Sequence, residues 1–253
     1  MKELTPTQVR LVRLALVVAL LAVWEIYARF ISTSSLIAGP SDVAMAWWPK
    51  VMGEPRVRTA VGITLIELAV AFGLSVVLGM LIGILIGLSE IGRRSLYPLV
   101  LLLYGIPQAI LLPLFVLIFG LGPAGKIAFG FTHGIFPVIV TTIAGMRNVN
   151  PLLLAGSAAM GATRAQQVRY VIFPNMVTTV FAGLRLAMTL TLLGVVLAEI
   201  FVSQGGIGFF TLLYSETFNP AALMALVLTL ALMAIALNEL VRLIEARFSR
   251  WKD

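Results

Sequence analysis

The sequence predicts an all-α, polytopic membrane protein with about six transmembrane helices and one cytoplasmic helix–Gly–helix elbow. Hydrophobic residues make up 60% of the 253-residue chain and charged residues 11%, and the mean hydropathy is +1.04. A soluble domain carries about a quarter charged residues, which cover its surface. Too little charge is present here to cover a globule, so most of the surface must contact lipid.

The net charge of +7 does not indicate a nucleic-acid-binding protein. No basic cluster interleaves with aromatic residues on a polar face, and the basic residues lie in short segments between apolar runs. That distribution is typical of membrane topology signals. We therefore expect membrane lipid, and no nucleic acid, among the partners.

Six segments are long and apolar enough to cross a bilayer, which takes about 20 residues of helix. They span residues 12–31, 60–88, 96–121, 127–146, 176–202 and 221–243. The first is expected to be retained, because no small-residue cleavage site follows it. Glu25 and Arg29, four residues apart near its end, can form an ion pair. Together the six spans predict a single transmembrane domain over residues 1–253.

Glycine and proline give the second and third spans individual features. Gly79, Gly83 and Gly87 repeat every four residues, which predicts a face for close helix packing. Gly105, Pro107 and Pro113 lie within the third span, where each proline removes a backbone donor and is expected to kink the helix.

The basic residues predict the topology. Twelve lie in the tails and loops assigned to one side, namely Lys2, Arg10, Arg13, Arg93, Arg94, Arg147, Arg164, Arg169, Arg242, Arg247, Arg250 and Lys252. Five lie on the other side, namely Arg29, Lys50, Arg56, Arg58 and Lys126. The positive-inside bias then places both termini and the 147–175 segment in the cytoplasm.

Polar residues inside the spans are candidates for pairing or for a pathway. Glu67 is costly in lipid unless it faces protein or water. Arg185 and Glu199 lie 14 residues apart, about 21 Å along a helix, too far to pair with each other. Residues that could line a pathway are Tyr104, Gln108, His133, Thr141, Thr142, Thr189, Thr191 and Glu199, with His133 favoured as a packing hydrogen bonder.

No catalytic motif is found. The chain has no Gly-rich phosphate loop followed by Lys-Ser/Thr, no HExxH, no GxSxG and no pair of carboxylates within one loop. It has no cysteine and one histidine, His133, which leaves little material for a metal site. We therefore expect no enzyme active site and no metal centre in this chain.

The stretch GSAAMGATRAQQVRYVIFPN, residues 156–175, is the most polar interruption between spans. Helix-forming residues up to Met160 are followed by the helix breaker Gly161, and Thr163 can cap a second helix from Arg164 to Val171. Ala165, Val168 and Ile172 would form an apolar stripe on that helix, opposite Arg164 and Gln167, and Pro174 stops the helix or starts the next span. Such an elbow is suited to bind in a groove of another protein, or alternatively to lie on anionic lipid headgroups.

These residues resemble a family motif. Gly161 is followed after nine residues by Val171-Ile172-Phe173-Pro174, and Ala155-Gly156-Ser157 lies before it. The pattern is similar to the cytoplasmic loop of the inner-membrane permease subunits of binding-protein-dependent ATP-binding cassette importers. That loop reads Glu-Ala-Ala, a glycine four residues later, and then Ile-x-Leu-Pro. The family's glutamate is replaced here by Ala155.

Further stretches over roughly residues 36–250 resemble the nitrate, sulfonate and taurine branch of that family. They are Ala38 to Val43, Ile106-Pro107, Leu112-Pro113-Leu114, Phe119 to Gly122, Gly183 to Ala187, Ala198-Glu199 and Gly205-Gly206-Ile207-Gly208. The resemblance implies a multi-pass permease of a bacterial-type inner membrane. Its cargo would be a small polar solute such as nitrate, a sulfonate or taurine, although some relatives carry pyrimidine vitamin precursors.

The resemblance also implies partners. A second permease copy, most simply a homodimer, would complete the pathway, and an extracytoplasmic binding protein would deliver the solute. Two separate ATPase subunits would bind ATP and Mg, so this chain would hold no cofactor, and they would dock on the elbow at 155–174. The coupling residues implied are Ala155, Gly156, Ser157, Gly161, Ala162, Arg164, Ala165, Val168, Val171 and Pro174.

Other classes remain as alternatives on the residues alone. A gradient-driven secondary transporter more often has ten or more spans and ionisable pairs at mid-membrane. A channel needs a filter segment between spans, and none is evident. A structural membrane assembly factor would explain the hydrophobicity but not the elbow.

Overall fold

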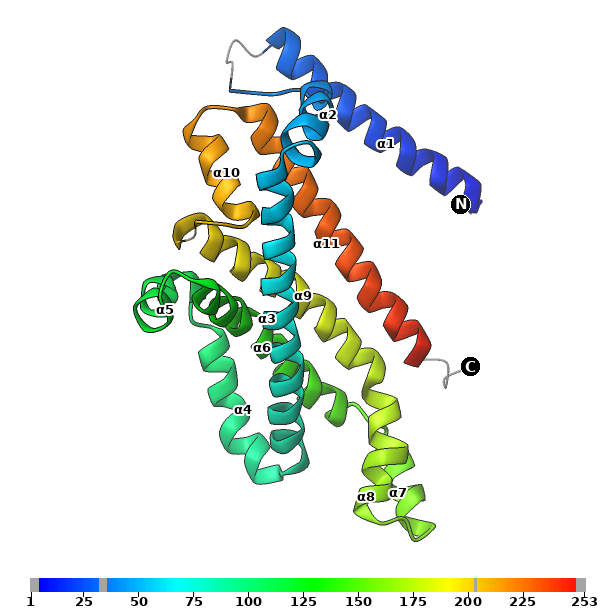
Figure 1. The fold of residues 1–253 in the computed structure, drawn as a ribbon. Helices are drawn as coiled ribbons and strands as arrows, with labels where there is room; N and C mark the ends of the chain where they lie inside the picture. Colours follow the sequence, from blue (N-terminus) through cyan, green and yellow to red (C-terminus); the bar gives the residue numbers. More distant parts are fainter. Residues whose placement is uncertain (1–4, 32–35, 203, 249–253) are drawn as a thin grey trace.

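Helices and turns make up the computed structural model, which describes residues 5–31, 36–202 and 204–248 and has no strand within them (Figure 1). Lys2, Arg250 and Lys252, which were counted for the topology, lie outside the described residues. The short helices α2 and α10 gather at one end of the bundle, and α7 and α8 lie at the other (Figure 1).

Five helical segments in the described ranges are long and apolar enough to span a membrane, and each overlaps a predicted span. They are Thr7–Ile31, Pro55–Leu88, Pro123–Arg147, Arg164–Val202 and Pro220–Phe248. The first contains α1 (Pro6–Ile26) and a π-helical turn, η1 (Tyr27–Ile31). The others are α3 (Pro55–Leu88), α6 (Pro123–Arg147), the run ending in α9 (Phe173–Val202), and α11 (Pro220–Phe248).

The third predicted span, 96–121, is bent at its prolines as expected, although the bend divides it into two helices instead of kinking one continuous helix. Helix α4 (Glu90–Tyr104) ends at Gly105, and a 3₁₀ turn, η3 (Gln108–Leu111), leads into α5 (Leu112–Phe119) at an angle of 78°. Pro107 restricts Ile106 to extended conformations and has no N–H to continue the helix. Pro113 lies in the first turn of α5, where a missing donor is tolerated.

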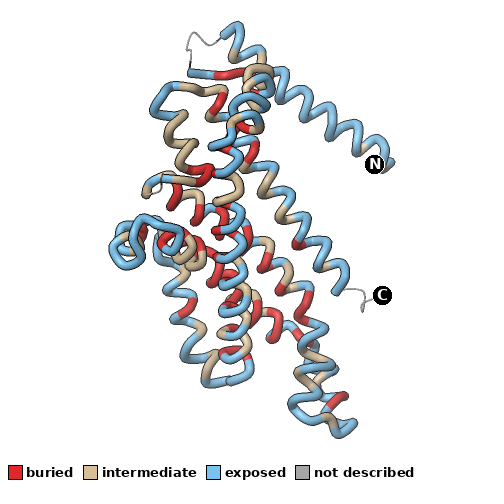
Figure 2. The backbone as a smooth tube through the Cα atoms, viewed as in Figure 1, coloured by how far each residue is buried: buried red, intermediate tan, exposed pale blue. Residues whose placement is uncertain are grey.

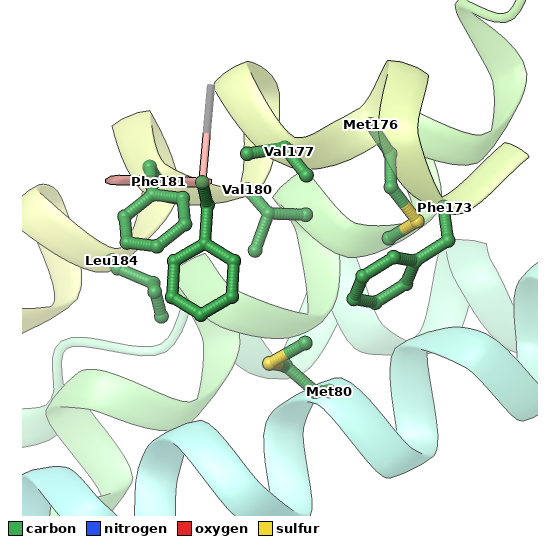
Figure 3. Close-up of a pocket in the computed structure, with 8 residues that line it drawn as sticks. Met80, Phe173, Met176, Val177, Val180, Phe181 and Leu184 are labelled. Carbon is green, nitrogen blue, oxygen red and sulfur yellow. The ribbon is translucent and has the colours of Figure 1, made fainter. Parts of the chain in front are cut away.

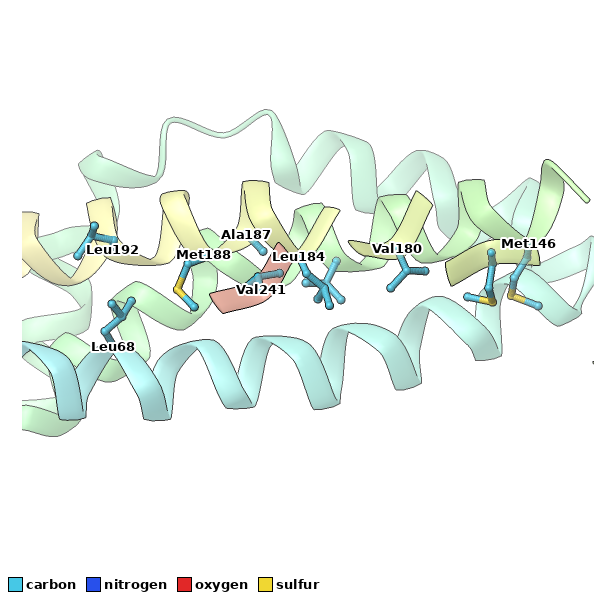
Figure 4. Close-up of a cluster of buried hydrophobic side chains, with 10 residues drawn as sticks. Leu68, Met146, Val180, Leu184, Ala187, Met188, Leu192 and Val241 are labelled. Atoms are coloured by element: carbon cyan, nitrogen blue, oxygen red, sulfur yellow. The ribbon is translucent and has the colours of Figure 1, made fainter. Parts of the chain in front are cut away.

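Helix α6 is the centre of the bundle and packs most extensively against α9 and α3. Their shared core contains Leu68, Val138 and a row of buried residues along α9 from Met176 to Leu192, and Val241 of α11 closes it (Figure 4). The side chains of this core are all apolar, so dispersion contacts and close packing hold this part of the bundle together in lipid.

The glycine repeat in α3 lies against α6. An added Cβ at Gly79 would lie 2.8 Å from Cβ of Val138, and one at Gly83 would lie 2.7 Å from Cβ of Thr142. At Gly87 the added Cβ would lie 2.5 Å from the sulfur of Met146. At Gly79 and Gly83 the neighbouring atom is a β-carbon, which cannot move away, so this close helix pair requires glycine there. At Gly87 the flexible Met146 side chain could move aside.

Helix α1 diverges from the bundle and is exposed along its length (Figures 1 and 2). It is attached at its end, where Glu25 forms the predicted ion pair with Arg29. The same carboxylate accepts hydrogen bonds from the backbone N–H of Ser41 at 3.0 Å and from its hydroxyl at 2.7 Å. Glu25 therefore joins α1 to the start of α2 (Pro40–Trp47).

Two short helices at this end were not predicted from the sequence. Helix α2 continues into a π-helical turn, η2 (Trp48–Met52), and α10 (Ile207–Glu216) follows a glycine-rich loop. Val43, Val51, Val57 and Ile207 form a second buried cluster with Leu226 of α11. Helices of 8 and 10 residues are too short to cross the bilayer, so hydropathy alone does not mark them.

Candidate functional site

The segment between α6 and α9 projects beyond the rest of the bundle (Figure 1). It consists of α7 (Pro151–Ala159), a tight turn, and α8 (Arg164–Gln167). Asn150 caps α7 by accepting a hydrogen bond from the N–H of Leu152 at 2.9 Å. We call residues 151–174 the elbow.

Gly161 makes the turn of the elbow with φ of +80°. The N–H of Gly161 donates to the carbonyl of Ala158 at 2.9 Å, and the N–H of Ala162 donates to the carbonyl of Ser157 at 3.0 Å. These two bonds form a Schellman motif, in which a left-handed residue terminates a helix and satisfies its last carbonyls. An added Cβ at Gly161 would meet nothing within 4 Å, so the backbone conformation, and not space, requires glycine here.

Thr163 caps the second helix as predicted. Its hydroxyl accepts from the N–H of Gln166, and the Gln166 side chain accepts from the N–H of Thr163 at 2.8 Å. This reciprocal pair is a capping box. It fixes the direction in which the chain leaves the turn at Gly161.

A side-chain bridge closes the elbow. The Gln167 amide donates to the hydroxyl of Ser157 at 3.1 Å and to the carbonyl of Leu154 at 3.2 Å, and the Ser157 hydroxyl donates to the same carbonyl at 2.9 Å. Ser157 is buried by this arrangement. The two helices of the elbow are therefore connected by the turn and by a hydrogen-bonded bridge.

The second helix of the elbow is not a separate element, which corrects the expectation of a helix from Arg164 to Val171. It runs through a π-helical turn, η4 (Val168–Ile172), directly into α9, so that residues 164–202 form one helical run. Pro174 lies in the first turn of α9. In an α-helix its ring would press on the carbonyl of Tyr170, and the wider π turn is a known way to accommodate such a conflict.

The exposed apolar residues of the elbow differ from the predicted stripe. Val168 and Ile172 are half-buried, and Ile172 packs against the core shared with α3 and α9. The most exposed large apolar side chains of the elbow are Met160 at 84%, Leu152 at 75% and Tyr170 at 66%. Of the predicted stripe, Val168 and Ile172 pack toward the bundle because the helix continues into it, and Ala165 stays exposed.

The remaining predicted coupling residues are distributed over both helices and the turn. Ala155, Gly156, Arg164, Ala165 and Pro174 are exposed, and Ala162 and Val171 are half-buried. Beside the elbow lies a hollow of about 500 Å³, bordered by Arg93, Arg94 and Arg147 together with Pro151 and Leu154 of α7. Glu90 lines the same hollow and pairs with Arg93 and Arg94, so basic residues outnumber acidic ones at this end of the molecule.

Five of the eight candidate pathway residues are enclosed between helices. His133 is 8% exposed and bonds the Phe129 carbonyl through Nδ1 at 3.0 Å. Thr141 donates to the Pro137 carbonyl at 2.7 Å and occupies the space above Gly183. Glu199 is fully buried. Thr142 and Thr191 are also buried.

The other three lie nearer the surface of the single chain. Tyr104 stacks on Phe136 with ring centroids 5.9 Å apart, and Gln108 begins the 3₁₀ turn after the break. The side-chain oxygen of Gln108 is buried without a hydrogen-bond partner. Thr189 is exposed and accepts a hydrogen bond from Asn238 at 3.2 Å.

An apolar pocket lies near the start of α9 (Figure 3). It has a volume of about 170 Å³, and its lining residues are Met80, Phe173, Met176, Val177, Val180, Phe181, Leu184 and Phe248. None of these side chains offers a hydrogen-bond donor or a charge. The pocket is therefore unsuited to hold a polar solute.

A buried ionic cluster at the other end of α9 was only partly foreseen. Glu67 of α3 pairs with Lys126 of α6, whose Nζ lies 2.5 Å from Oε1 of Glu67. Lys126 was expected in an external loop, but it lies in the first turn of α6 and is 4% exposed. The sequence did contain a signal for the burial of Lys126, since a lone lysine in an apolar helix requires a partner.

Arg185, which is too far from Glu199 to pair with it, pairs with Glu245 of α11.

A family model described as the inner membrane component of binding-protein-dependent transport systems matches residues 75–253. Among curated proteins, the formylaminopyrimidine transport permease protein ThiX of Halalkalibacterium halodurans is 30% identical over 216 residues, covering 85% of this chain and 86% of that protein. The putative aliphatic sulfonates transport permease protein SsuC of Bacillus subtilis is 26% identical over 241 residues, covering 95% and 87%.

The fold is similar to that of a solved structure, described as inward facing conformations of the MetNI methionine ABC transporter. The TM-score is 0.63 at 20% sequence identity, and the match covers 77% of this chain and 95% of the other. At this identity the likeness concerns the fold alone. The family model matches residues 75–253 of this chain, a range that includes the elbow.

Proposed function

The chain belongs to the family of inner membrane components of binding-protein-dependent transport systems, and we propose that it couples solute transfer to separate ATPase subunits through its elbow. As a member of that family it is a permease subunit of an ATP-binding cassette importer, and a gradient-driven transporter or channel is not favoured. The observation that carries the coupling proposal is the unbroken helical run from Arg164 to Val202.

This helical run can transmit force between the two ends of the molecule. It has 39 residues, about 58 Å at 1.5 Å per residue. The end of the run in the elbow is held to α7 by the Gln167 bridge, and the part within the bundle packs against α6 and α3. A load on the elbow therefore acts on the central helices and not on a flexible loop.

The tip of the elbow has the composition of a docking surface. Exposed Leu152 and Met160 supply apolar contact area, and Arg164 and Arg169 of the same elbow are also exposed. Interface cores are enriched in methionine and arginine. Two ATPase subunits would receive one elbow from each of two permease copies, most simply a homodimer, and would bind ATP and Mg themselves. Their closure would draw the elbows together and reopen the bundle toward the outside.

The solute would be a small polar compound that an extracytoplasmic binding protein has already selected. Two relatives of similar closeness are named for chemically different cargo, a formylaminopyrimidine and aliphatic sulfonates. Within this chain several polar residues of the spans are enclosed and the pocket at α9 is apolar. These features support a permease of low intrinsic specificity, with nitrate, sulfonate or taurine-like anions as the first solutes to test. Both termini and the elbow would be cytoplasmic.

Copurification of ATP hydrolysis tests the coupling proposal. The tagged chain is purified from its native membrane, and hydrolysis of ATP by the preparation is measured. We expect Met160→Asp to lose the hydrolysis, because a charge at the exposed tip opposes apolar docking. The matched control is Phe218→Asp, at the opposite end and 73% exposed, which should keep it. Equal hydrolysis in the parent and both variants would place the ATPase contact elsewhere.

A further inference from the structure

Three ionisable side chains from three different helices meet in the interior near the external end of α9. Glu67 of α3 is 2% exposed, Lys126 of α6 is 4% exposed and Glu199 of α9 is fully buried. Besides the ion pair between Glu67 and Lys126, both of these residues interact electrostatically with Glu199. The cluster thus contains two carboxyl groups and one ammonium group.

The charges of these three groups do not balance when all are ionised. Two carboxylates and one ammonium leave one net negative charge inside a helix bundle, where an uncompensated charge is strongly unfavourable. No further charged side chain joins the cluster from α10, whose residues 207–215 are uncharged. Arg56 is exposed and borders an open groove with Gly205 and Gly206, and no ion pair between it and the cluster is found among the described residues.

The hydrogen bonds show where a proton is missing. Glu199 accepts from the hydroxyl of Thr64 at 2.7 Å and from the N–H of Gly208 at 2.9 Å, so both of its oxygens have donors. Oε1 of Glu67 is paired with the ammonium group of Lys126, whereas Oε2 of Glu67 is buried without a hydrogen-bond partner. Shared neighbours bring Glu67 and Glu199 together: Thr64, which donates to Glu199, lies one turn from Glu67 on α3, and Lys126, which pairs with Glu67, donates to the carbonyl of Gly205 in the loop that contacts Glu199. Two carboxylates have only acceptors, so a bond between them requires a hydrogen.

We propose that the Glu67–Glu199 pair binds one proton inside the membrane, and that this proton makes the cluster with Lys126 electrically neutral. The proton lies between the two carboxyl groups, and Lys126 acts as a tethered cation on the outer side of Glu67. Such a pair of carboxyl groups sharing one proton is the expected state when like charges are held close together. The cluster would hold its proton whether or not the chain couples to an ATPase.

The proton would also hold the external glycine-rich loop in place. Gly206 has φ of +99°, and an added Cβ there would lie 2.0 Å from Oε1 of Glu199. The N–H of Ile207 donates to the Thr64 hydroxyl at 2.9 Å, and Nζ of Lys126 donates to the Gly205 carbonyl at 3.4 Å. The backbone of residues 205–208 therefore packs on the side chains of Glu199, Thr64 and Lys126. Repulsion between two ionised carboxylates would loosen that packing.

Infrared spectroscopy of the full chain in nanodiscs tests the proposal directly. At neutral pH we expect the carbonyl stretching band of a protonated carboxylic acid in the parent. The band should disappear in Glu67→Gln and in Glu199→Gln, because the remaining carboxylate then balances Lys126 without a proton. Absence of the band from the parent, or its persistence in both variants, would overturn the proposal.

Thermal unfolding separates charge balance from simple packing. Each single Glu→Gln variant keeps the cluster neutral and should change the Tm by less than about 4 °C. Lys126→Met leaves two carboxyl groups without a cation and should lower the Tm by about 10 °C. Adding Glu67→Gln to Lys126→Met should restore part of the loss, and Glu67→Gln/Glu199→Gln should be less stable than either single variant. Additive effects in these pairs would indicate packing alone and contradict the shared proton.

Raising the pH provides a third readout on the same proteins. The parent must lose its proton as the pH rises, and its Tm should then fall, while the Tm of Glu67→Gln should fall less over the same range. The groups that face the pair are Lys126 from α6 and the uncharged Thr64 and Gly208. Identical pH profiles for the parent and both single variants would count against the proposal.

Discussion

The side-chain amide of Gln167 lies 3.1 Å from the hydroxyl of Ser157 and joins the two helices of the elbow. Gln167 belongs to the same helical run as α9 and Ser157 belongs to α7, so this contact helps the elbow to move as a unit with the central helices. The predictions below test this bridge, the turn beside it, the packing of α3, the topology and the affinity for solute.

Removal of the bridge should weaken coupling without unfolding the chain. We expect Gln167→Leu and Ser157→Ala each to reduce ATP-driven uptake in proteoliposomes by up to about tenfold, since a neutral hydrogen bond contributes roughly 1 kcal/mol. The double variant should be no worse than the more impaired single variant, because both remove the same contact. Multiplying losses in the double variant would show that the two residues act separately.

Substitution of Gly161 should distinguish backbone strain from lost space. Gly161→Val should abolish uptake and association with the ATPase while leaving membrane insertion intact, because φ of +80° is strongly unfavourable for a β-branched residue. Gly161→Asp and Gly161→Asn provide the comparison: asparagine tolerates the left-handed region best and should retain most uptake. Parental uptake by Gly161→Val would mean that the turn is not maintained during transport.

Substitution by alanine should lower the Tm at Gly83 of α3 but not at Gly73 of the same helix. Gly83→Ala should lower the Tm by between about 4 and 10 °C, as overpacking a helix interface costs about 1–3 kcal/mol. The added Cβ would lie 2.7 Å from Cβ of Thr142. Gly73→Ala is the matched control, because its added Cβ meets nothing within 4 Å. Equal Tm values for the two variants would argue against the tight contact with α6.

The chain contains no cysteine, so single cysteines can report topology without further changes. Met160→Cys lies at the tip of the elbow and Phe218→Cys at the opposite end, with exposed fractions of 84% and 73% in the parent residues. A membrane-impermeant maleimide should label Phe218→Cys in intact spheroplasts and Met160→Cys only after permeabilisation. The reverse labelling would contradict the cytoplasmic assignment made from the basic residues.

The purified chain should bind solutes weakly by itself. Calorimetry in nanodiscs against nitrate, a sulfonate and taurine should detect no binding stronger than about millimolar, equivalent to −4 kcal/mol, because the enclosed polar residues leave few groups free to hold a solute. Specificity of uptake should follow the binding protein supplied. Micromolar binding without a binding protein, about −8 kcal/mol, would indicate a solute site within the chain.

Local chemistry was sufficient to predict much of this molecule. Apolar runs predicted five helices that the structure contains, the Thr163 capping box was predicted from four consecutive residues, and Glu25 and Arg29 were predicted to pair from their spacing. The family was recognised from Gly161 and the residues around it. In each case the interacting groups lie within a few residues of each other, so the sequence displays them directly.

Contacts between distant residues were decided only by the tertiary structure. Lys126 directly precedes a predicted span and was assigned to a loop for that reason, whereas its burial depends on Glu67 of another helix. Glu199 meets Thr64 across a separation of 135 residues. Hydropathy sums over a window of the chain and cannot report which helix a charge will face. Only the packing of α3, α6 and α9 brings two carboxyl groups and one amine together, and the low polarity of that interior is the physical reason that their charges must balance there.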